Sequence, residues 1–272
     1  MPPPPQYIAT LEHAALRPYK NLRRPQDHIE GGIFVAEGEK VVRRLVNSSL
    51  TLVSFLLTSE WYDELTATES RFVQSSAGVF VAEKRLLEQI VGYRLHQGIM
   101  AVGRVPAEPS LTDLVQEGSE DAVLVVALDG LMNSENVGVL VRNCAGFGVK
   151  AVLVGETSSG PYLRRAVRNS MGAVFQLPVV HSKNLQASLK ELRALGTTIV
   201  AADPKGEMPI EKMDFRRASC IVFGNEEAGV TARVLNVCDH RVSIPMRNRT
   251  DSLNVANASA VFLYEANRQR KK

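Results

Sequence analysis

The sequence predicts an α/β protein, with a parallel sheet covered by helices on both faces in its second half. Short apolar runs there alternate with segments of helical periodicity, and polar loops rich in Gly, Asn, Asp and Ser follow these runs. A chain of 272 residues is also long enough for two domains, each with its own core. The strands expected in the second half span residues 122–128, 150–154, 197–202, 219–223 and 241–244.

The first half predicts a smaller α/β domain. Its stretch "GGIFVAEGEKVVRRLVNSS" has the pattern of a strand, a turn and a helix, and "LTLVSFLLTS" after it that of a buried strand. The later stretch "GRVPAEPSLTDLVQEGSED" contains prolines and acidic residues with little apolar density, which is typical of a linker. We therefore expect a first domain over residues 1–105, a linker over 106–120 and a second domain over 121–272.

Composition excludes several classes of protein. No apolar run approaches the roughly 18 residues that a membrane span needs, and the N-terminal "MPPPPQYIAT" does not resemble a secretion signal, so we expect a cytoplasmic protein. The cysteines Cys144, Cys220 and Cys238 have no CxxC spacing and lie among apolar residues. They predict buried thiols and neither a zinc site nor a disulfide framework, and we expect no metal.

The formal net charge of +3 is small, but the basic residues are clustered. Clusters of this kind suit a polyanion such as nucleic acid. Each cluster also has a plainer interpretation as a solvated, solubilising surface. The clusters cover residues 19–24, 163–169, 247–249 and 268–272.

The polar loops of the second half are where a ligand site is expected. They read "DGLMNSENVG", "GETSSGPYLRR", "DPKGEM", "GNEEAG" and "PMRNRTDSLN", and each follows an expected strand. Ligands of open α/β sheets bind outside the carboxyl ends of the strands. Turn geometry alone also favours such residues. The sequence contains no GxGxxG after a strand, no GxxxxGK[ST], no GxSxG and no HExxH, which disfavours the usual nicotinamide, NTP, hydrolase and zinc-protease sites.

The stretch "NVGVLVRNCAGFG" places a single arginine in an apolar helix. At about 100° per residue, Gly138, Arg142 and Gly146 share one face, which indicates that something approaches the backbone beside the arginine. Asn136 is expected to cap a helix that begins at Val137, and the cap and the arginine could together hold a ribose and its phosphate. The alternative is a solvated arginine followed by a glycine stop.

Three separated blocks resemble, in order and spacing, the motifs of the SpoU family of RNA ribose 2'-O-methyltransferases, which belong to the SPOUT class. These blocks are "NVGVLVRNCAGFG", "IVFGNEEAG" and "IPMRNRTDSLNVANASAVFLYEA". The stretch "PYLRRAVRNSMGAVFQLPV" resembles the segment between the first two motifs. "FVAEGEKVVRRLV" and "HQGIMAV" resemble the ribosomal-protein-like substrate-binding domain that often precedes the catalytic domain.

The resemblance implies properties that composition cannot show. It implies a C-terminal deep trefoil knot, an exception to the rule that chains are unknotted. It implies S-adenosylmethionine as the cofactor, structured RNA (rRNA or tRNA) as the substrate, and a homodimer with active sites at the subunit interface. It also implies that residues 1–105 bind the RNA.

The motif residues carry over one by one. Asn136 and Arg142 match the pair of the first motif, Glu226 matches the acid of the second, and Ser252 and Asn254 match the polar pair of the third. The resemblance implies catalytic roles for these residues. In this family the arginine activates the ribose hydroxyl, as a base or by stabilising oxyanion charge; because a guanidinium stays protonated, we prefer the second role.

Other positions match those that line the cofactor in the family. These are Gly224, Ile244 and Leu253, together with Ala202 on the preceding strand. Family members usually carry glycine where Asn248 stands, but asparagine tolerates the left-handed backbone region that glycine favours.

Two other functions are compatible with parts of this pattern. One is a non-catalytic RNA-binding protein that retains the methyltransferase fold, and a more distant one is an unrelated nucleotide-binding α/β domain. The complete set of motif residues argues against both, and cofactor binding would discriminate between them.

Overall fold

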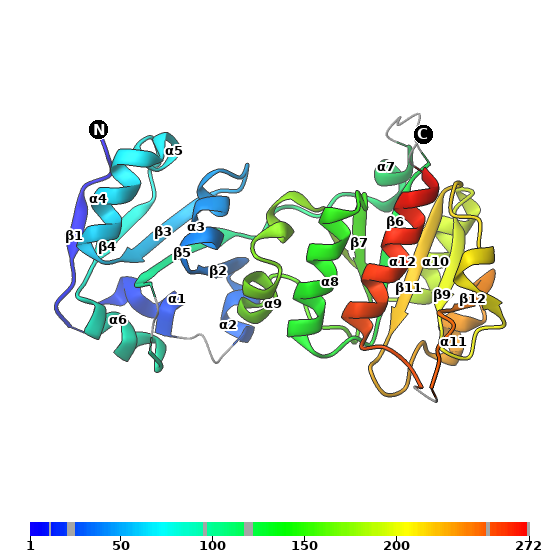
Figure 1. Cartoon of the computed structure of the whole chain (residues 1–272). Coiled ribbons are helices and arrows are strands. Elements are labelled where there is room, and N and C mark those ends of the chain that lie inside the picture. The colour runs from blue at the N-terminus through cyan, green and yellow to red at the C-terminus, as the bar shows by residue number, and fades with distance from the viewer. Residues whose placement is uncertain (11, 21–24, 95–96, 117–121, 249–250, 271–272) are drawn as a thin grey trace. The chain divides into compact units, whose positions relative to one another are not determined.

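The computed structural model describes residues 1–272 with the exception of 11, 21–24, 95–96, 117–121, 249–250 and 271–272. The chain divides into two units (Figure 1). Unit 1 comprises residues 1–106 and 162–175, and unit 2 comprises 107–161 and 176–272. Each unit is described by itself below.

Unit 1 is built on a five-stranded mixed sheet. Its strands are β1 (Pro5–Tyr7), β2 (Ile33–Glu37), β3 (Leu52–Leu57), β4 (Gly78–Val81) and β5 (Ile99–Arg104). The order is β1-β4-β3-β5-β2; β1, β4 and β3 are parallel, and β5 is antiparallel to both β3 and β2. Its helices are η1 (Ala14–Leu16), α1 (Arg17–Lys20), α2 (Pro25–Glu30), α3 (Glu39–Val46), α4 (Ser59–Thr68), α5 (Ser70–Val73), α6 (Lys84–Val91), α9 (Arg164–Asn169) and most of η2 (Ala173–Gln176).

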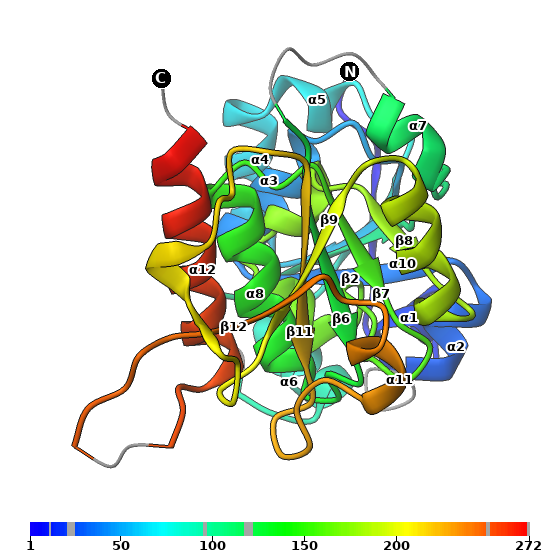
Figure 2. The ribbon, with the colours of Figure 1, turned by 90° about the vertical axis from the view of Figure 1, so that its right-hand side faces the viewer.

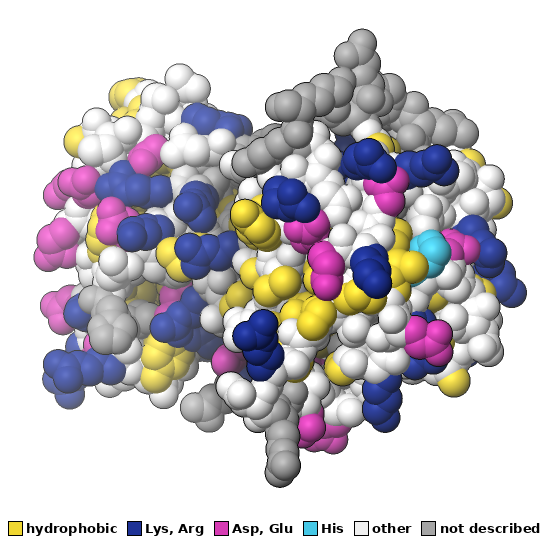
Figure 3. Space-filling model, turned by 45° about the vertical axis from the view of Figure 1, so that its right-hand side comes forward, with side chains coloured by type: hydrophobic (Ala, Val, Ile, Leu, Met, Phe, Trp, Pro, Cys, Tyr) yellow, Lys and Arg dark blue, Asp and Glu magenta, His cyan; other side chains and the backbone are white. Residues whose placement is uncertain are grey.

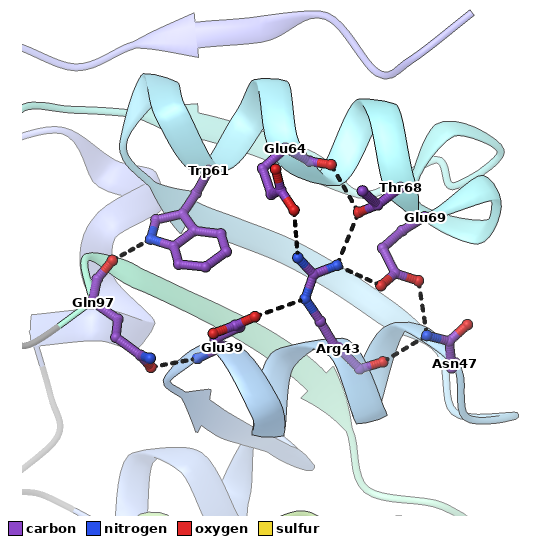
Figure 4. A network of polar contacts seen from close by, with 8 residues as sticks. All are labelled: Glu39, Arg43, Asn47, Trp61, Glu64, Thr68, Glu69 and Gln97. Atoms are coloured by element: carbon purple, nitrogen blue, oxygen red, sulfur yellow. Dashed lines mark hydrogen bonds and ion pairs between the residues drawn. The ribbon is translucent and has the colours of Figure 1, made fainter.

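Helix α3 follows β2 as predicted, and its two faces differ in burial. Val41, Val42 and Leu45 are buried, because apolar residues three and four positions apart lie on one helical face. On another face, Arg43 Nη1 donates to Glu69 Oε1 over 2.7 Å and Nη2 donates to Glu64 Oε1 over 2.9 Å (Figure 4). These ion pairs join α3 to the end of α4.

Unit 1 contains one segment from far along the chain. Residues 162–175, which lie outside the expected first domain, pack on β2. Phe175 stacks on Phe34 with ring centroids 5.2 Å apart, and Arg164 Nη2 donates to Glu37 Oε2 over 2.7 Å. The Arg164 guanidinium also lies over the ring of Tyr93, 4.7 Å from its centroid.

Unit 2 is built on a seven-stranded sheet. Its strands are β6 (Leu124–Asp129), β7 (Ala151–Val154), β8 (Val179–His181), β9 (Thr198–Ala202), β10 (Met208–Pro209), β11 (Ser219–Gly224) and β12 (His240–Ser243). The order is β10-β12-β9-β11-β6-β7-β8, and every neighbouring pair is parallel. The predicted parallel sheet is therefore confirmed. All of the expected strands are present, whereas β8 and β10, three and two residues long, were not predicted.

Helices cover both faces of this sheet (Figure 2). They are α7 (Leu111–Gln116), α8 (Ser134–Gly146), α10 (Leu185–Ala194), η3 (Ile210–Lys212), α11 (Ala232–Leu235) and α12 (Val255–Arg270). Helices α8 and α12 pack side by side on one face, and α10 and α11 lie on the other. Apolar side chains fill both layers: Leu189 of α10 belongs to the core cluster under the sheet, and Phe262 of α12 meets Phe223 of β11 edge to face.

Helix α7 lies within the stretch expected to be a linker. Leu111 and Leu114 are three residues apart and lie on one helical face, and Leu114 is buried in the core of unit 2. The apolar density of the stretch is low, but these side chains suffice to order its middle. The last residues of the expected linker lie outside the described part of the chain.

The cysteines are free thiols, as predicted. Cys144 and Cys220 are buried, and burial raises the pKa of both thiols. Cys238 is only partly buried, which corrects the expectation for that residue. Among the described residues, no helix is long and apolar enough to span a bilayer, and no group of three or more His, Cys, Asp or Glu could hold a metal ion.

Candidate active site

A cavity of about 520 Å³ opens at the carboxyl ends of β9, β11 and β12. Parallel strands end at the same edge of a sheet, so the loops that follow them meet there. All of the residues expected to line the cofactor are on its wall, namely Ala202, Gly224, Ile244 and Leu253.

Gly224 ends β11 and admits no side chain. A Cβ at this position would lie 2.2 Å from the backbone carbon of Gly229, because the next residues fold back over it. Asn225 and Gly229 exchange backbone hydrogen bonds of 3.0 and 2.9 Å, and Gly229 has a φ of 70°, in the left-handed region. The side chain of Asn225 donates to the carbonyl oxygen of Gly130 over 2.9 Å, which fixes this loop to the one after β6.

Three of the expected catalytic residues form one hydrogen-bonded group. Asn136 Nδ2 donates to Glu226 Oε1 over 2.9 Å, and Asn254 Nδ2 donates to Asn136 Oδ1 over 3.3 Å. Glu226 and Asn254 line the cavity, as does Ser252. The structure thus brings residues from all three motifs to one place at the sheet edge.

The start of α8 differs from the prediction. The helix begins at Ser134, and its cap is Asn133, whose side chain accepts from the backbone N–H of Glu135 over 2.9 Å. Asn136 lies inside the first turn. Its side-chain amide therefore does not cap the helix and donates a hydrogen bond to Glu226 instead.

Arg142 is exposed and is not part of the cavity wall. It follows Asn136 by six residues, which at about 100° per residue places the two side chains about 120° apart around the helix. The two side chains therefore lie on different faces of α8, and a ligand held by both residues stays a prediction. The guanidinium makes no hydrogen bond or ion pair with any residue that the structure describes.

The glycines on either side of Arg142 differ from each other. Gly138 is buried, whereas a Cβ at Gly146 would meet nothing within 4 Å. Packing inside the chain therefore explains a small residue only at Gly138. The helix ends at Gly146, and Gly148 after it has a φ of 74°, which lets the N–H of Val149 reach the carbonyl of Cys144 over 3.0 Å.

Two polar residues that sequence reasoning missed hold the site together. Asn143 Nδ2 donates to the carbonyl of Ala256 over 2.9 Å and to Ser259 Oγ over 3.0 Å, which ties α8 to the first turns of α12. Asp129, at the end of β6, accepts from the N–H and the hydroxyl of Thr231. Asn143 directly follows the more conspicuous Arg142, and Asp129 lies at the start of a polar loop, where turn geometry alone favours such a residue.

Asn248, in the segment between β12 and α12, has the expected backbone conformation. Asn248 has a φ of 57°, so asparagine adopts the left-handed conformation at the position where glycine is usual. On another wall of the cavity, Arg241 Nη2 pairs with Asp203 Oδ2 over 2.7 Å. This ion pair links β12 to the loop after β9.

The comparisons with known proteins concern most of the chain. Residues 123–264 match the model of the SpoU rRNA Methylase family. An uncharacterized tRNA/rRNA methyltransferase of Mycobacterium bovis is 34% identical over 255 residues, which cover 90% of this chain and 84% of that protein.

Solved structures resemble the whole chain. The SpoU methyltransferase AviRb from Streptomyces viridochromogenes, in complex with AdoMet, superposes with a TM-score of 0.81 at 25% identity, over 95% of this chain and 98% of that one. An RNA 2'-O ribose methyltransferase superposes with a TM-score of 0.78 at 25% identity, over 97% and 99% of the two chains.

Proposed function

The chain belongs to the SpoU rRNA methylase family, and we propose that it transfers a methyl group from S-adenosylmethionine to a ribose 2'-hydroxyl of a structured rRNA or tRNA. The observation that carries the proposal is the hydrogen-bonded group of Asn136, Glu226 and Asn254 beside the cavity. Structural similarity to an RNA 2'-O ribose methyltransferase over nearly the whole chain, at 25% sequence identity, supports the ribose as the acceptor.

The cavity suits the cofactor in size and chemistry. Its volume of about 520 Å³ is typical of small-molecule sites. Ile244 and Leu253 offer apolar surface, and the carboxylates of Glu226 and Asp251 offer negative charge to a sulfonium. A Cβ at Gly229 would meet nothing within 4 Å, so the backbone is open to the cavity at that point.

The chain's own residues position the acceptor and stabilise charge. When bound, S-adenosylmethionine supplies the methyl group. Glu226 holds the Asn136 amide in one orientation, and the two asparagines then offer preorganised polar groups at the cavity. Arg142 orients the ribose hydroxyl and stabilises the oxyanion that develops as the proton leaves, because its guanidinium remains protonated.

A homodimer explains why Arg142 lies away from the cavity of its own chain. In the proposed dimer, the arginine completes the site of the partner subunit. Figure 3 shows hydrophobic side chains gathered on the face of unit 2 in view. Val261 and Tyr264 of α12 are 37% and 59% exposed, and Tyr264 packs edge to face on Phe147 at the end of α8. An exposed apolar surface over these helices is suited to a second copy of the chain.

We assign RNA binding to unit 1 and methyl transfer to unit 2, for which the family resemblance also implies a trefoil knot. The assignment of residues 1–105 to RNA and a cytoplasmic location both stay predictions. The rival function is RNA binding without catalysis on the same fold.

Two measurements test the proposal. Isothermal titration with S-adenosylmethionine should give an affinity near the micromolar range, about −8 kcal/mol. The protein with radiolabelled cofactor should then label RNA from cells that lack the gene, at an alkali-resistant linkage, since a 2'-O-methyl group blocks cleavage there. Cofactor binding without any transfer to such RNA would favour the non-catalytic rival, and no binding by folded protein would exclude the methyltransferase.

A further inference from the structure

Three exposed cations of unit 1 lie on two helices, α3 and α9, and α9 packs on β2 within the same unit. Lys40 and Arg44 are four residues apart on α3, so both lie on its exposed face. Arg168 lies on the exposed face of α9. Lys and Arg side chains are conspicuous on the face of unit 1 in view (Figure 3).

Arg44 itself makes the link between the two helices. Its Nη1 donates to the carbonyl oxygen of Met171, just after α9, over 2.6 Å. A Cβ at Gly172 would lie 3.3 Å from the Cβ of Arg44, so the backbone after α9 passes directly over α3. Met171 takes a φ of 54°, unusual for a residue with a side chain, in making this turn. The segment after α9 is therefore held against α3 by specific contacts within unit 1.

The carboxylates that flank these cations are engaged elsewhere. Glu39 accepts from Arg43, whose other ion pairs reach α4. Glu37 accepts from Arg164. In the described part of the chain, Lys40, Arg44 and Arg168 have no carboxylate within ion-pair distance. The local acids therefore do not neutralise the three cations.

We propose that Lys40, Arg44 and Arg168 form a phosphate-binding surface for the RNA substrate; this rests on the proposed function. Unpaired cations on an exposed face attract the phosphate backbone and displace its counterions. Arg43 and Arg164, by contrast, form ion pairs with carboxylates of unit 1 and so stabilise the unit. The surface is made jointly by α3 and by a segment that belongs, in the sequence, to the methyltransferase half.

The segment that carries Arg168 is continuous in sequence with unit 2. The chain reaches α9 from the loop after β7, where Ser158 Oγ accepts from the N–H of Leu131 over 3.1 Å. Leu131 lies in the loop that leads to Asn133 and α8.

The test is the salt dependence of binding to a fluorescent RNA hairpin of about 20 base pairs. The logarithm of the binding constant falls linearly with the logarithm of the salt concentration, and each lost phosphate contact makes this negative slope shallower by about 0.9. In the full-length Lys40→Ala/Arg44→Ala/Arg168→Ala protein, the magnitude of the slope should therefore decrease by about 2 to 3. Near 100 mM salt, its affinity for the hairpin should be lower by about tenfold or more. The Lys40→Ala/Arg168→Ala protein keeps the Arg44 contact to Met171, and the magnitude of its slope should decrease by about 2.

The matched control removes the same charge from exposed lysines of unit 2, as Lys183→Ala/Lys190→Ala/Lys212→Ala. This variant should keep a slope closer to that of the wild type. Equal losses in control and test variants would mean that only net charge matters and would overturn the surface, as would an unchanged slope or a wild-type protein that binds no hairpin. Salt-dependent binding without methyl transfer to any RNA would instead count against the proposed function and leave the surface standing.

Discussion

Asn136 of α8 donates a 2.9 Å hydrogen bond to Glu226 in the loop after β11, although ninety positions separate them. Asn254, just before α12, donates to the same asparagine. One amide therefore connects the first turn of α8 to two loops, and the three come together only in the folded chain. Replacing Asn136 with Ala removes both bonds, and we expect the methylation rate to fall by about 10- to 100-fold while the protein stays folded.

Asn143→Ala is the comparison for that variant, because Asn143 lies on the same helix and bonds to Ala256 and Ser259 of α12. Its loss leaves a buried hydroxyl and a carbonyl with fewer partners, so urea denaturation should show a free energy of unfolding lower by about 1 to 3 kcal/mol. If Asn136→Ala loses stability and keeps its rate, the hydrogen-bonded group is structural only.

Gly224 should tolerate no substitution. The Cβ of Gly224→Ala would lie 2.2 Å from backbone atoms of Gly229 and Val230, which cannot move aside as a flexible side chain can. We expect a loss of about 4 kcal/mol or more in unfolding free energy, together with loss of cofactor binding in titration calorimetry. Gly146→Ala is the control, since its Cβ meets nothing within 4 Å, and its stability should be unchanged or higher by up to about 1 kcal/mol. Wild-type stability in Gly224→Ala would show that the loop over it can open.

The sheet of unit 2 was predictable because its long strands are apolar on both faces, as in Leu124–Asp129. The short strands β8 and β10 carry too few residues to stand out from loops. The position of residues 162–175 was not predictable either. It depends on the stacking of Phe175 on Phe34 and on the ion pair of Arg164 with Glu37. In each of these contacts the two residues are more than a hundred positions apart in the sequence.

The site shows the same division between local and long-range information. The positions predicted to line the cofactor follow from motif order, because each ends a parallel strand or follows one. The cap of α8 was assigned to Asn136, since one asparagine near a helix start looks like another in sequence. Only the bond to Glu226 distinguishes it from Asn133. Periodicity alone placed Arg142 beside glycines, but it did not show that the cation lies outside its own chain's cavity.

Glu265 should stabilise α12 in a pH-dependent way. Hydrogen bonds from Arg268 and Gln269 lower the pKa of this carboxyl to about 2. A carboxyl whose pKa is depressed in the folded state contributes its full stability above the unfolded pKa of about 4.3 and loses it as the pH falls through the folded value. Glu265→Gln should thus lower the unfolding free energy by about 1 to 2 kcal/mol at pH 7, and the difference should shrink between pH 4.5 and 2. Glu211→Gln, at an exposed position, serves as the control, and a difference that does not change with pH would contradict the assignment.

Tyr264 should lie in the dimer contact. A charge placed there would have to be buried without a partner, so Tyr264→Glu should convert the dimer to monomer in sedimentation velocity at micromolar concentration. Tyr7→Glu alters a tyrosine of unit 1 that is more exposed than Tyr264, and it should leave the dimer intact. A Tyr264→Glu protein that remains dimeric would place the contact elsewhere, and a wild-type protein that sediments as a monomer would contradict the dimer itself.

Arg142 gives the sharpest test of the catalytic assignment. The side chain is exposed and pairs with nothing in the described part of its own chain, so Arg142→Ala should leave stability and cofactor affinity nearly unchanged. The methylation rate should fall by about 100-fold or more, because the lost contact is made most strongly as the oxyanion develops. Arg142→Lys should also lose most of the methylation rate, since an ammonium does not reproduce the planar fork that reaches a hydroxyl and a phosphate together.

A mixed dimer separates the two subunits' contributions. If Arg142 acts in the partner's site, combining Arg142→Ala with Asn136→Ala subunits restores one site that has both residues intact, and part of the activity should return. If each chain uses its own arginine, the mixed dimer stays as inactive as its parents. A rate that Arg142→Ala does not change would make the residue a solvated surface arginine, and loss of cofactor binding in a folded dimer would move its role to the cofactor.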